Sequence, residues 1–166
     1  SLGVHESQSR LWENLIGRSK SFWICYFPVL QRIFTNVFSQ ISVDEFYQAI
    51  NQLQPSLIRV EADEVTYNLH IIIRFELELD MLTGSLHLDD LPAAWADKYK
   101  KYLGLTPKND TDGVLQDIHW SIGAIGYFPT YTIGNLLSVQ LLNSAEKELG
   151  DLEANILEGD FEPLLC

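Results

Sequence analysis

The chain has 166 residues, enough for one globular domain or a compact part of a larger one. Hydrophobic residues make up 46% of it and aromatic residues 11%, which excludes an intrinsically disordered chain. Its 11 Lys and Arg against 23 Asp and Glu give a formal net charge of −12, which argues against nucleic-acid binding because such a surface repels phosphate backbones.

The N-terminal part of the chain is predicted to be helical. Residues 4–16 place apolar side chains along one side and end at Gly17, a common helix stop. Residues 21–38 are nearly all apolar, and Pro28 inside them should break or kink a helix there. We therefore expect two helices before residue 40.

A capping box predicts where the next helix begins. Ser42 and Glu45 stand three residues apart, so each side chain can bond the other residue's free backbone N–H. The helix should begin at Val43, run toward Leu53 and end before Pro55. Residues 57–61 then alternate branched apolar residues with charged ones, the pattern of a short strand.

The longest periodic pattern covers residues 62–82, which we expect to form one helix closed by Gly84. A shorter helix is expected at 92–103, because Pro92 suits a first helical position. The apolar residues that recur at three- and four-residue steps along the long helix are Val65, Leu69, Ile72, Phe75, Leu79 and Leu82.

The C-terminal part reads as a polar loop, a glycine-punctuated aromatic segment and two further helices at about 133–149 and up to 158. The fold class is therefore mainly α, with at most a small β-sheet. We expect residues 1–166 to form a single region without an internal boundary.

The first motif that could carry chemistry is His5-Glu6-Ser7-Gln8-Ser9. It begins like the zinc helix H-E-x-x-H, in which two histidines four residues apart bind the metal. Ser9 stands at the second histidine position, and a serine hydroxyl is a poor zinc ligand. These residues form no complete zinc site, and the alternative is a polar stretch on a solvated helix face.

The second motif is IRVEAD, residues 58–63. Arg59 stands between apolar residues, where an arginine usually has a fixed partner, and its guanidinium suits a carboxylate. Asp63 precedes the long helix, where an acid can cap free backbone N–H groups. His70, in the apolar part of that helix, is more simply a satisfied core residue than a metal ligand.

The third motif is GVLQDIHW, residues 113–120. Asp117 and His119 alternate, so in an extended segment they can point to one side and form a carboxylate-oriented imidazole that donates a proton or a hydrogen bond. The alternative is a buried polar corner that stabilises a turn. Tyr127 and Tyr131 follow among closely spaced glycines, which fits a binding-cleft wall or an ordinary irregular loop.

In this order, the three motifs resemble those of the thermostable metallocarboxypeptidase family typified by carboxypeptidase Taq. The resemblance implies a mostly helical, cleft-shaped fold and the removal of single residues from a peptide's free C-terminus. In that family the two histidines of an H-E-x-x-H helix and the glutamate of the H-E-S block hold one zinc ion, and that glutamate corresponds to Glu6. The H-E-x-x-H helix, with its general-base glutamate, is absent from this sequence.

The resemblance also implies roles for other residues. Arg59 would recognise the substrate's terminal carboxylate, and His119, steadied by Asp117, would donate a hydrogen bond to the oxyanion of the tetrahedral intermediate. The residues that would line the substrate pocket are Gln116, Tyr127 and Tyr131. Because one carboxylate cannot hold a catalytic zinc ion against water, we expect this chain alone to bind no zinc and to be inactive.

We expect these residues to be part of a longer polypeptide, because the chain opens at Ser1 and its only methionine is Met81. The two cysteines, Cys25 and Cys166, and the lack of a signal peptide or membrane-length apolar run favour a cytoplasmic protein. The resemblance implies peptide substrates, zinc or another divalent ion in the intact protein, and a homodimer as one assembly. Two alternatives stay open: a truncated relative that binds peptide C-termini through Arg59, and a structural helical interaction domain.

Overall fold

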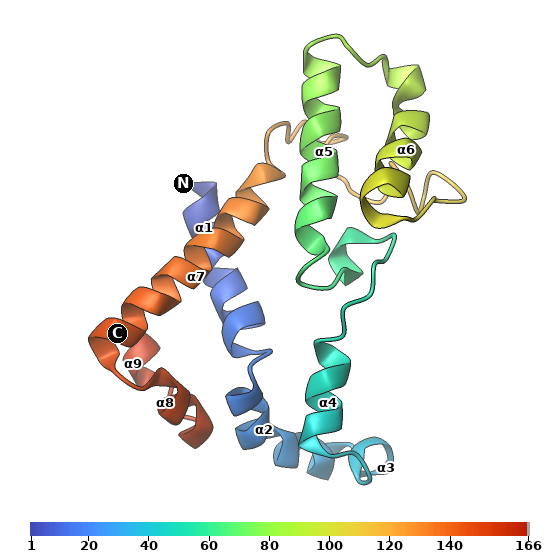
Figure 1. Cartoon of the computed structure of the whole chain (residues 1–166). Helices are drawn as coiled ribbons and strands as arrows, with labels where there is room; N and C mark the ends of the chain where they lie inside the picture. The colour runs from blue at the N-terminus through green and yellow to red at the C-terminus, as the bar shows by residue number, and fades with distance from the viewer. Residues whose placement is uncertain (166) are drawn as a thin grey trace. The chain divides into compact units, whose positions relative to one another are not determined.

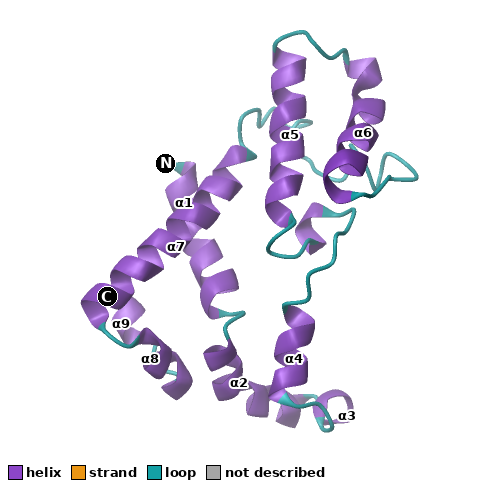
Figure 2. Ribbon diagram, in the orientation of Figure 1, coloured by secondary structure: helices purple, strands orange, loops and turns teal. Residues whose placement is uncertain are grey.

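The computed structural model describes residues 1–165, and these residues form helices joined by turns and loops (Figure 2). Cys166 lies outside the described residues, while Cys25 is a free, half-buried thiol. The mainly α class is confirmed, and no strand occurs within residues 1–165. No helix in that range combines the length and the apolar character needed to span a membrane.

The chain divides into two compact units, each containing several of the helices labelled in Figure 1. The terminal unit comprises Ser1–Gln52 together with the stretch from Ile133 to the C-terminus, and the central unit comprises Leu53–Thr132. Whether both belong to one region, as expected from the sequence, stays a prediction.

The terminal unit begins with a helix that changes its winding partway. α1 (Leu2–Arg10) continues directly into the π-helical turn η1 (Leu11–Ile16), where Gly17 N–H donates to the carbonyl of Trp12 at 2.8 Å. The buried core of this unit is formed by Leu11, Ile16 and Ile156. The other helices of this unit are α2 (Lys20–Ile33), α3 (Thr35–Phe38), α4 (Val43–Ile50), most of α7 (Pro129–Leu149), α8 (Leu152–Glu158) and α9 (Glu162–Leu165).

Pro28 does not break α2, which ends before Phe34, and whether it kinks the helix stays a prediction. α2 continues past Pro28, whose ring is exposed, so the carbonyl that loses its N–H partner lies on the solvent side. Phe34 leaves the helical region (φ −116°, ψ 52°), and Gln31 Nε2 donates to the carbonyls of Phe38 at 3.1 Å and Ile41 at 2.9 Å. This side chain fixes the turn that ends α2 and leads through α3 to α4.

The capping box that begins α4 is confirmed. Ser42 N–H donates to the Glu45 carboxylate at 2.8 Å, and Glu45 N–H donates to the Ser42 hydroxyl at 3.2 Å. The helix ends at Ile50 rather than near Leu53. Asn51 Nδ2 donates to the carbonyls of Tyr47 at 3.0 Å and Arg18 at 3.2 Å, which anchors the helix end against the end of the first helical segment.

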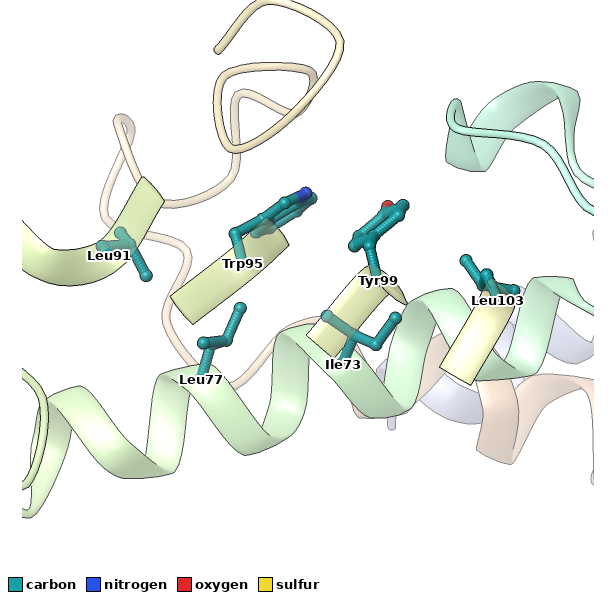
Figure 3. Packing of buried hydrophobic residues seen from close by; sticks show 6 residues of the cluster. All are labelled: Ile73, Leu77, Leu91, Trp95, Tyr99 and Leu103. Atoms are coloured by element: carbon teal, nitrogen blue, oxygen red, sulfur yellow. The ribbon is translucent and has the colours of Figure 1, made fainter. Parts of the chain in front are cut away.

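The central unit is built on two helices, α5 (Tyr67–Leu82) and α6 (Leu91–Leu103), which lie side by side in Figure 1. The short 3₁₀ turn η3 (Leu88–Asp90) leads into α6, with Pro92 in its first turn as expected, and Gly104 ends α6 with a left-handed φ of 72°. Figure 3 shows the core between the two helices, formed by Ile73 and Leu77 of α5 and Leu91, Trp95, Tyr99 and Leu103 of α6.

The prediction of a short strand at residues 57–61 is wrong. Arg59–Glu61 form a 3₁₀ turn, η2, in which Glu61 and Ala62 N–H groups donate to the carbonyls of Ile58 and Arg59. A strand needs a neighbouring strand to satisfy its backbone groups, and residues 1–165 offer none, so the segment satisfies them locally.

The apolar residues that recur along α5 in the sequence do not form its inward face. Four residues of the predicted apolar face are exposed: Ile72 by 40%, Phe75 by 42%, Leu79 by 44% and Leu82 by 66%. The side that packs into the central unit carries Ile73 and Leu77 together with the polar residues His70, Arg74 and Glu78. Periodicity could not decide between the faces because α5 is apolar on both.

Alanine substitutions two residues apart on α5 test which face is inward. Leu77 is fully buried, so Leu77→Ala should lower the free energy of unfolding by about 2–5 kcal/mol. Leu79→Ala, on the exposed side, should change it by less than about 1 kcal/mol. Urea unfolding of both variants measures the difference, and a larger loss for Leu79→Ala would contradict the observed orientation.

Candidate functional site

Glu6 is positioned by a close crossing of α1 and α7. The buried residues at the crossing are small, Ser7 on α1 and Gly134 and Ser138 on α7. A Cβ added to Gly134 would lie 2.9 Å from the Glu6 Cβ, closer than real Cβ atoms approach other atoms, and 3.2 Å from the Ser7 backbone nitrogen, tighter than most such contacts. Only glycine at 134 therefore allows the backbone of Glu6 to lie against α7.

A hydrogen bond between side chains fixes the register of the same crossing. Arg10 Nε donates to Asn135 Oδ1 at 2.7 Å, and Ser7 Oγ donates to the carbonyl of Val4 at 2.6 Å. Glu6 is half-buried, while its neighbour His5 is exposed. The H-E-S motif thus presents a carboxylate from a helix whose backbone is held in place by packing.

The residues present do not make a complete metal site. Glutamate oxygen is an ordinary zinc ligand, but structural and catalytic zinc sites take three or four protein ligands. Within residues 1–165 no group of three or more His, Cys, Asp or Glu side chains is placed to hold a metal ion. Glu6 therefore fits the role of one ligand in a site that needs further ligands.

In the IRVEAD motif, Asp63 caps the turn that leads into α5. Its Oδ1 accepts from the N–H groups of Val65 at 2.9 Å and Thr66 at 2.8 Å, and its Oδ2 accepts from the Gln54 N–H at 3.1 Å. Burial opposes ionisation of Asp63, but these hydrogen bonds hold its pKa below the usual value. Asp63 therefore caps the free N–H groups of this turn, while α5 itself begins at Tyr67 rather than at 62, after Thr66, which makes no side-chain cap.

Arg59 has its fixed partner within the chain. Its Nε and Nη2 donate to Asp117 Oδ1 at 3.0 and 2.6 Å, and its Nη1 donates to the Tyr67 hydroxyl at 3.0 Å. Its guanidinium lies 5.1 Å from the centre of the Tyr131 ring, within cation–π range. The side chain is 8% exposed, so this fork-like pair is almost entirely removed from water.

A second arginine, Arg74 of α5, binds the other oxygen of the same carboxylate. Its Nε donates to Asp117 Oδ2 at 2.7 Å, and its Nη2 lies 2.6 Å from the same oxygen. Its Nη1 donates to the His70 carbonyl at 2.8 Å, and its guanidinium lies over the Trp95 ring at 4.6 Å. Sequence reasoning missed Arg74, although a cation inside the run IIIRFELEL was a signal that it has a buried partner.

The two arginines dominate the electrostatics of this cluster. Burial disfavours the charged form of Asp117, but hydrogen bonds from Arg59 and the charge of Arg74 outweigh it and lower the pKa of Asp117. Burial likewise opposes the charge of Arg59, and Asp117 more than offsets it, so the Arg59 pKa is raised. Two guanidinium groups facing one carboxylate leave the cluster with one positive charge in excess.

Gln116 ties both arginines to the backbone. Its Oε1 accepts from the Arg59 N–H at 2.8 Å and from Arg74 Nη2 at 2.9 Å. Its Nε2 donates to the carbonyls of Leu57 at 3.0 Å and Asp112 at 3.1 Å. The Gln116 side chain is therefore engaged within the protein, and its expected place in a substrate pocket stays a prediction.

His119 is oriented by Tyr131 more directly than by Asp117. His119 Nε2 lies 3.1 Å from the Tyr131 hydroxyl, whereas His119 Nδ1 lies 3.9 Å from Asp117 Oδ1, beyond hydrogen-bond distance. The ring packs against Phe128 and Tyr127, with centroids 4.4 and 5.4 Å apart. The expected extended segment is instead a series of turns, in which Ala124 N–H donates to the His119 carbonyl at 2.8 Å.

A buried carboxylate of α5 holds the loop that follows His119. Glu78, 2% exposed, accepts the backbone N–H of Gly126, whose left-handed φ of 79° favours glycine. His70, Arg74 and Glu78 therefore form one buried stripe at four-residue spacing.

The structure brings six of the predicted site residues together in the central unit: Arg59, Gln116, Asp117, His119, Tyr127 and Tyr131; Glu6 belongs to the terminal unit.

The place of His70 in the core is confirmed. It is fully buried, and its Nδ1 lies 2.9 Å from the Tyr99 hydroxyl. Burial, together with the charges of Arg74 and Arg59, lowers the pKa of His70 to about 4. A neutral imidazole beside two guanidinium groups avoids adding a third buried positive charge.

Residues 1–166 match the carboxypeptidase Taq (M32) metallopeptidase family over their whole length. Thermostable carboxypeptidase 1 of Thermus thermophilus is 56% identical over 165 residues, which cover 99% of this chain and 32% of that protein. Carboxypeptidase 1 of Bacillus subtilis is 46% identical over 164 residues, covering 99% and 33%. The crystal structure of the M32 carboxypeptidase from Deinococcus radiodurans R1 aligns with a TM-score of 0.94 at 51% identity, covering 99% of this chain and 33% of that one. The chain thus spans about a third of the length of the curated relatives it matches.

The lowered pKa of His70 predicts a specific loss of stability in acid. Between pH 6.5, the ordinary histidine pKa, and about pH 4, the unfolded chain binds a proton at His70 that the folded chain does not. The contribution of His70 to the free energy of unfolding is therefore fully present above pH 6.5 and is lost as the pH falls toward 4. The loss attributable to His70 is about 3 kcal/mol at pH 4. Urea unfolding between pH 7 and 4 should show a flatter profile for His70→Gln than for the wild type; equal slopes for the two proteins would contradict the assignment.

Proposed function

The chain belongs to the carboxypeptidase Taq (M32) metallopeptidase family, and we propose on that premise that its residues form part of a zinc metallocarboxypeptidase that removes single residues from the free C-terminus of peptides. The observation that carries the proposal is the meeting of two motifs. Arg59 of IRVEAD and Asp117 of GVLQDIHW, 58 residues apart, form a buried bidentate pair with His119 and Tyr131 beside it. Such a rigid cluster is what a preorganised peptide-binding wall requires.

In this proposal Glu6 supplies one metal ligand, completed by ligands outside residues 1–166. Glu6 would hold the zinc ion together with those ligands, and the metal would supply Lewis-acid activation of a water. The close crossing at Gly134 supports the role, because a metal ligand must be held in one position by its own helix. Another divalent ion in place of zinc is compatible with the same carboxylate.

The central unit would act on the substrate. His119, held by Tyr131, would donate a hydrogen bond to the oxyanion of the tetrahedral intermediate, and Asp117 would steady the segment that carries it. Arg59 would attract the substrate's terminal carboxylate, supported by the excess positive charge of the cluster. Gln116, Tyr127 and Tyr131 would shape the wall around it.

The chain by itself is proposed to be inactive, because one carboxylate does not hold zinc against water. A cytoplasmic location and a homodimeric assembly complete the proposal. The free thiol of Cys25 supports the location, since thiols persist in reducing compartments.

A chimera tests the proposal: residues 1–166 replace the matching third of the Thermus thermophilus relative, with which they share 56% identity. The chimera should bind zinc and hydrolyse an N-blocked dipeptide. Glu6→Gln should weaken zinc binding by more than roughly 100-fold, the upper end for residues that only orient a ligand. Glu13→Gln, at a largely exposed carboxylate of the same helical segment, serves as the control and should retain metal and activity.

Zinc content by atomic emission and the hydrolysis rate are the two readouts. Full zinc occupancy and activity in Glu6→Gln would contradict the role of Glu6. Hydrolysis by residues 1–166 alone would contradict the proposed inactivity, and a folded, zinc-loaded chimera without activity would contradict the substrate-side roles.

A further inference from the structure

The outward face of α5 consists of large apolar side chains. Within α5, the residues that are exposed are Ile72, Phe75, Leu79 and Leu82, and Val65 just before the helix is exposed by 60%. We call these five residues the outer seam. A solvent-facing helix surface normally carries polar residues, and a contiguous apolar one marks a contact surface.

The spacing of the residues in the outer seam indicates which kind of element would pack against it. Val65, Ile72 and Leu79 are seven residues apart, and Phe75 and Leu82 repeat the same interval three residues later. This is the a and d pattern of a helix that packs along another helix, knobs into holes. The opposite side of α5 already packs against α6 through Ile73 and Leu77, so α5 has the composition of a helix enclosed on both sides.

The acidic residues next to the outer seam are turned away from it. Glu76 accepts from Lys98 Nζ at 2.8 Å and from the Tyr102 hydroxyl at 2.8 Å, and Asp80 lies 3.4 Å from Lys98. Lys98 and Tyr102 both belong to α6, so these carboxylates are held on the α6 side of the helix. These two carboxylates are therefore already paired within the central unit.

We propose that the outer seam is the docking surface for one amphipathic helix from the remainder of a polypeptide of the relatives' length. The chain covers 32% of the Thermus thermophilus relative and 33–34% of two solved structures whose fold it matches over 99% of its own residues, with TM-scores of 0.94–0.95, so about two thirds of each of those chains lies outside the matched part and is available to cover the seam. A second copy is the less favourable occupant, because it would bring together two chains with a net charge of −12 each.

Thiol accessibility tests the proposal at single positions. Phe75→Cys is placed in a background of Cys25→Ala and Cys166→Ala, both in residues 1–166 alone and in the chimera with the Thermus thermophilus relative. Lys100→Cys, at an exposed position of α6, is the matched control. The reaction with a water-soluble disulfide reagent should be at least roughly 100-fold slower for Cys at position 75 in the chimera than in the isolated chain, since a buried thiol reacts only after local opening. The control thiol should react equally fast in both.

Each other outcome overturns the proposal. Equal reactivity of the position 75 thiol in both proteins means that nothing in the longer chain covers the seam. Protection in the isolated chain that grows with protein concentration means that a second copy covers it, and protection independent of concentration means that the terminal unit does. The double substitution Phe75→Glu with Leu79→Glu in the isolated chain keeps the test decisive if the chimera is insoluble: unchanged thermal unfolding supports an uncovered seam, and a fall of more than roughly 8 °C overturns it.

Discussion

One carboxylate shared by two buried arginines organises the central unit. Asp117 receives Arg59 on one oxygen and Arg74 on the other, and all three side chains are less than 10% exposed. Removing charges from water is costly, and this arrangement recovers the cost through short, charge-assisted bonds on both sides of the carboxylate. Because Arg59 lies in η2, Arg74 in α5 and Asp117 in a loop, the same bonds join three segments that have no sheet to connect them.

This shared carboxylate links the fold to the proposed chemistry. It fixes the loop that presents His119, leaving the imidazole to be oriented by Tyr131 and Phe128. Burial and the charges of the two arginines together lower the pKa of His70. The position of Glu6, the proposed metal ligand, depends on a different constraint, the close helix crossing at Gly134.

Local signals in the sequence predicted local structure well. The capping box at Ser42, the proline at the start of α6 and the cap formed by Asp63 each depend on residues a few positions apart, and each is confirmed. The inward face of α5 could not be predicted, because it depends on where Asp117 and Gly126 lie, more than 40 residues along the chain. For the same reason the sequence showed that Arg59 needed a partner without showing that Asp117 is that partner. The prediction of a strand at residues 57–61 was wrong because an alternating pattern does not show whether a neighbouring strand is present.

A double-mutant cycle on the unfolding free energy measures the shared carboxylate most directly. Arg74→Met and Asp117→Asn each break a buried ion pair, which typically costs about 3–5 kcal/mol. The double variant should be more stable than the sum of the single losses implies, with a coupling energy of at least about 2 kcal/mol, because Arg74 is an uncompensated buried charge once Asp117 is replaced, and its removal then costs less. Losses that add to within about 0.5 kcal/mol would show that Arg74 and Asp117 act independently, and the account of how this unit is held together would then be wrong.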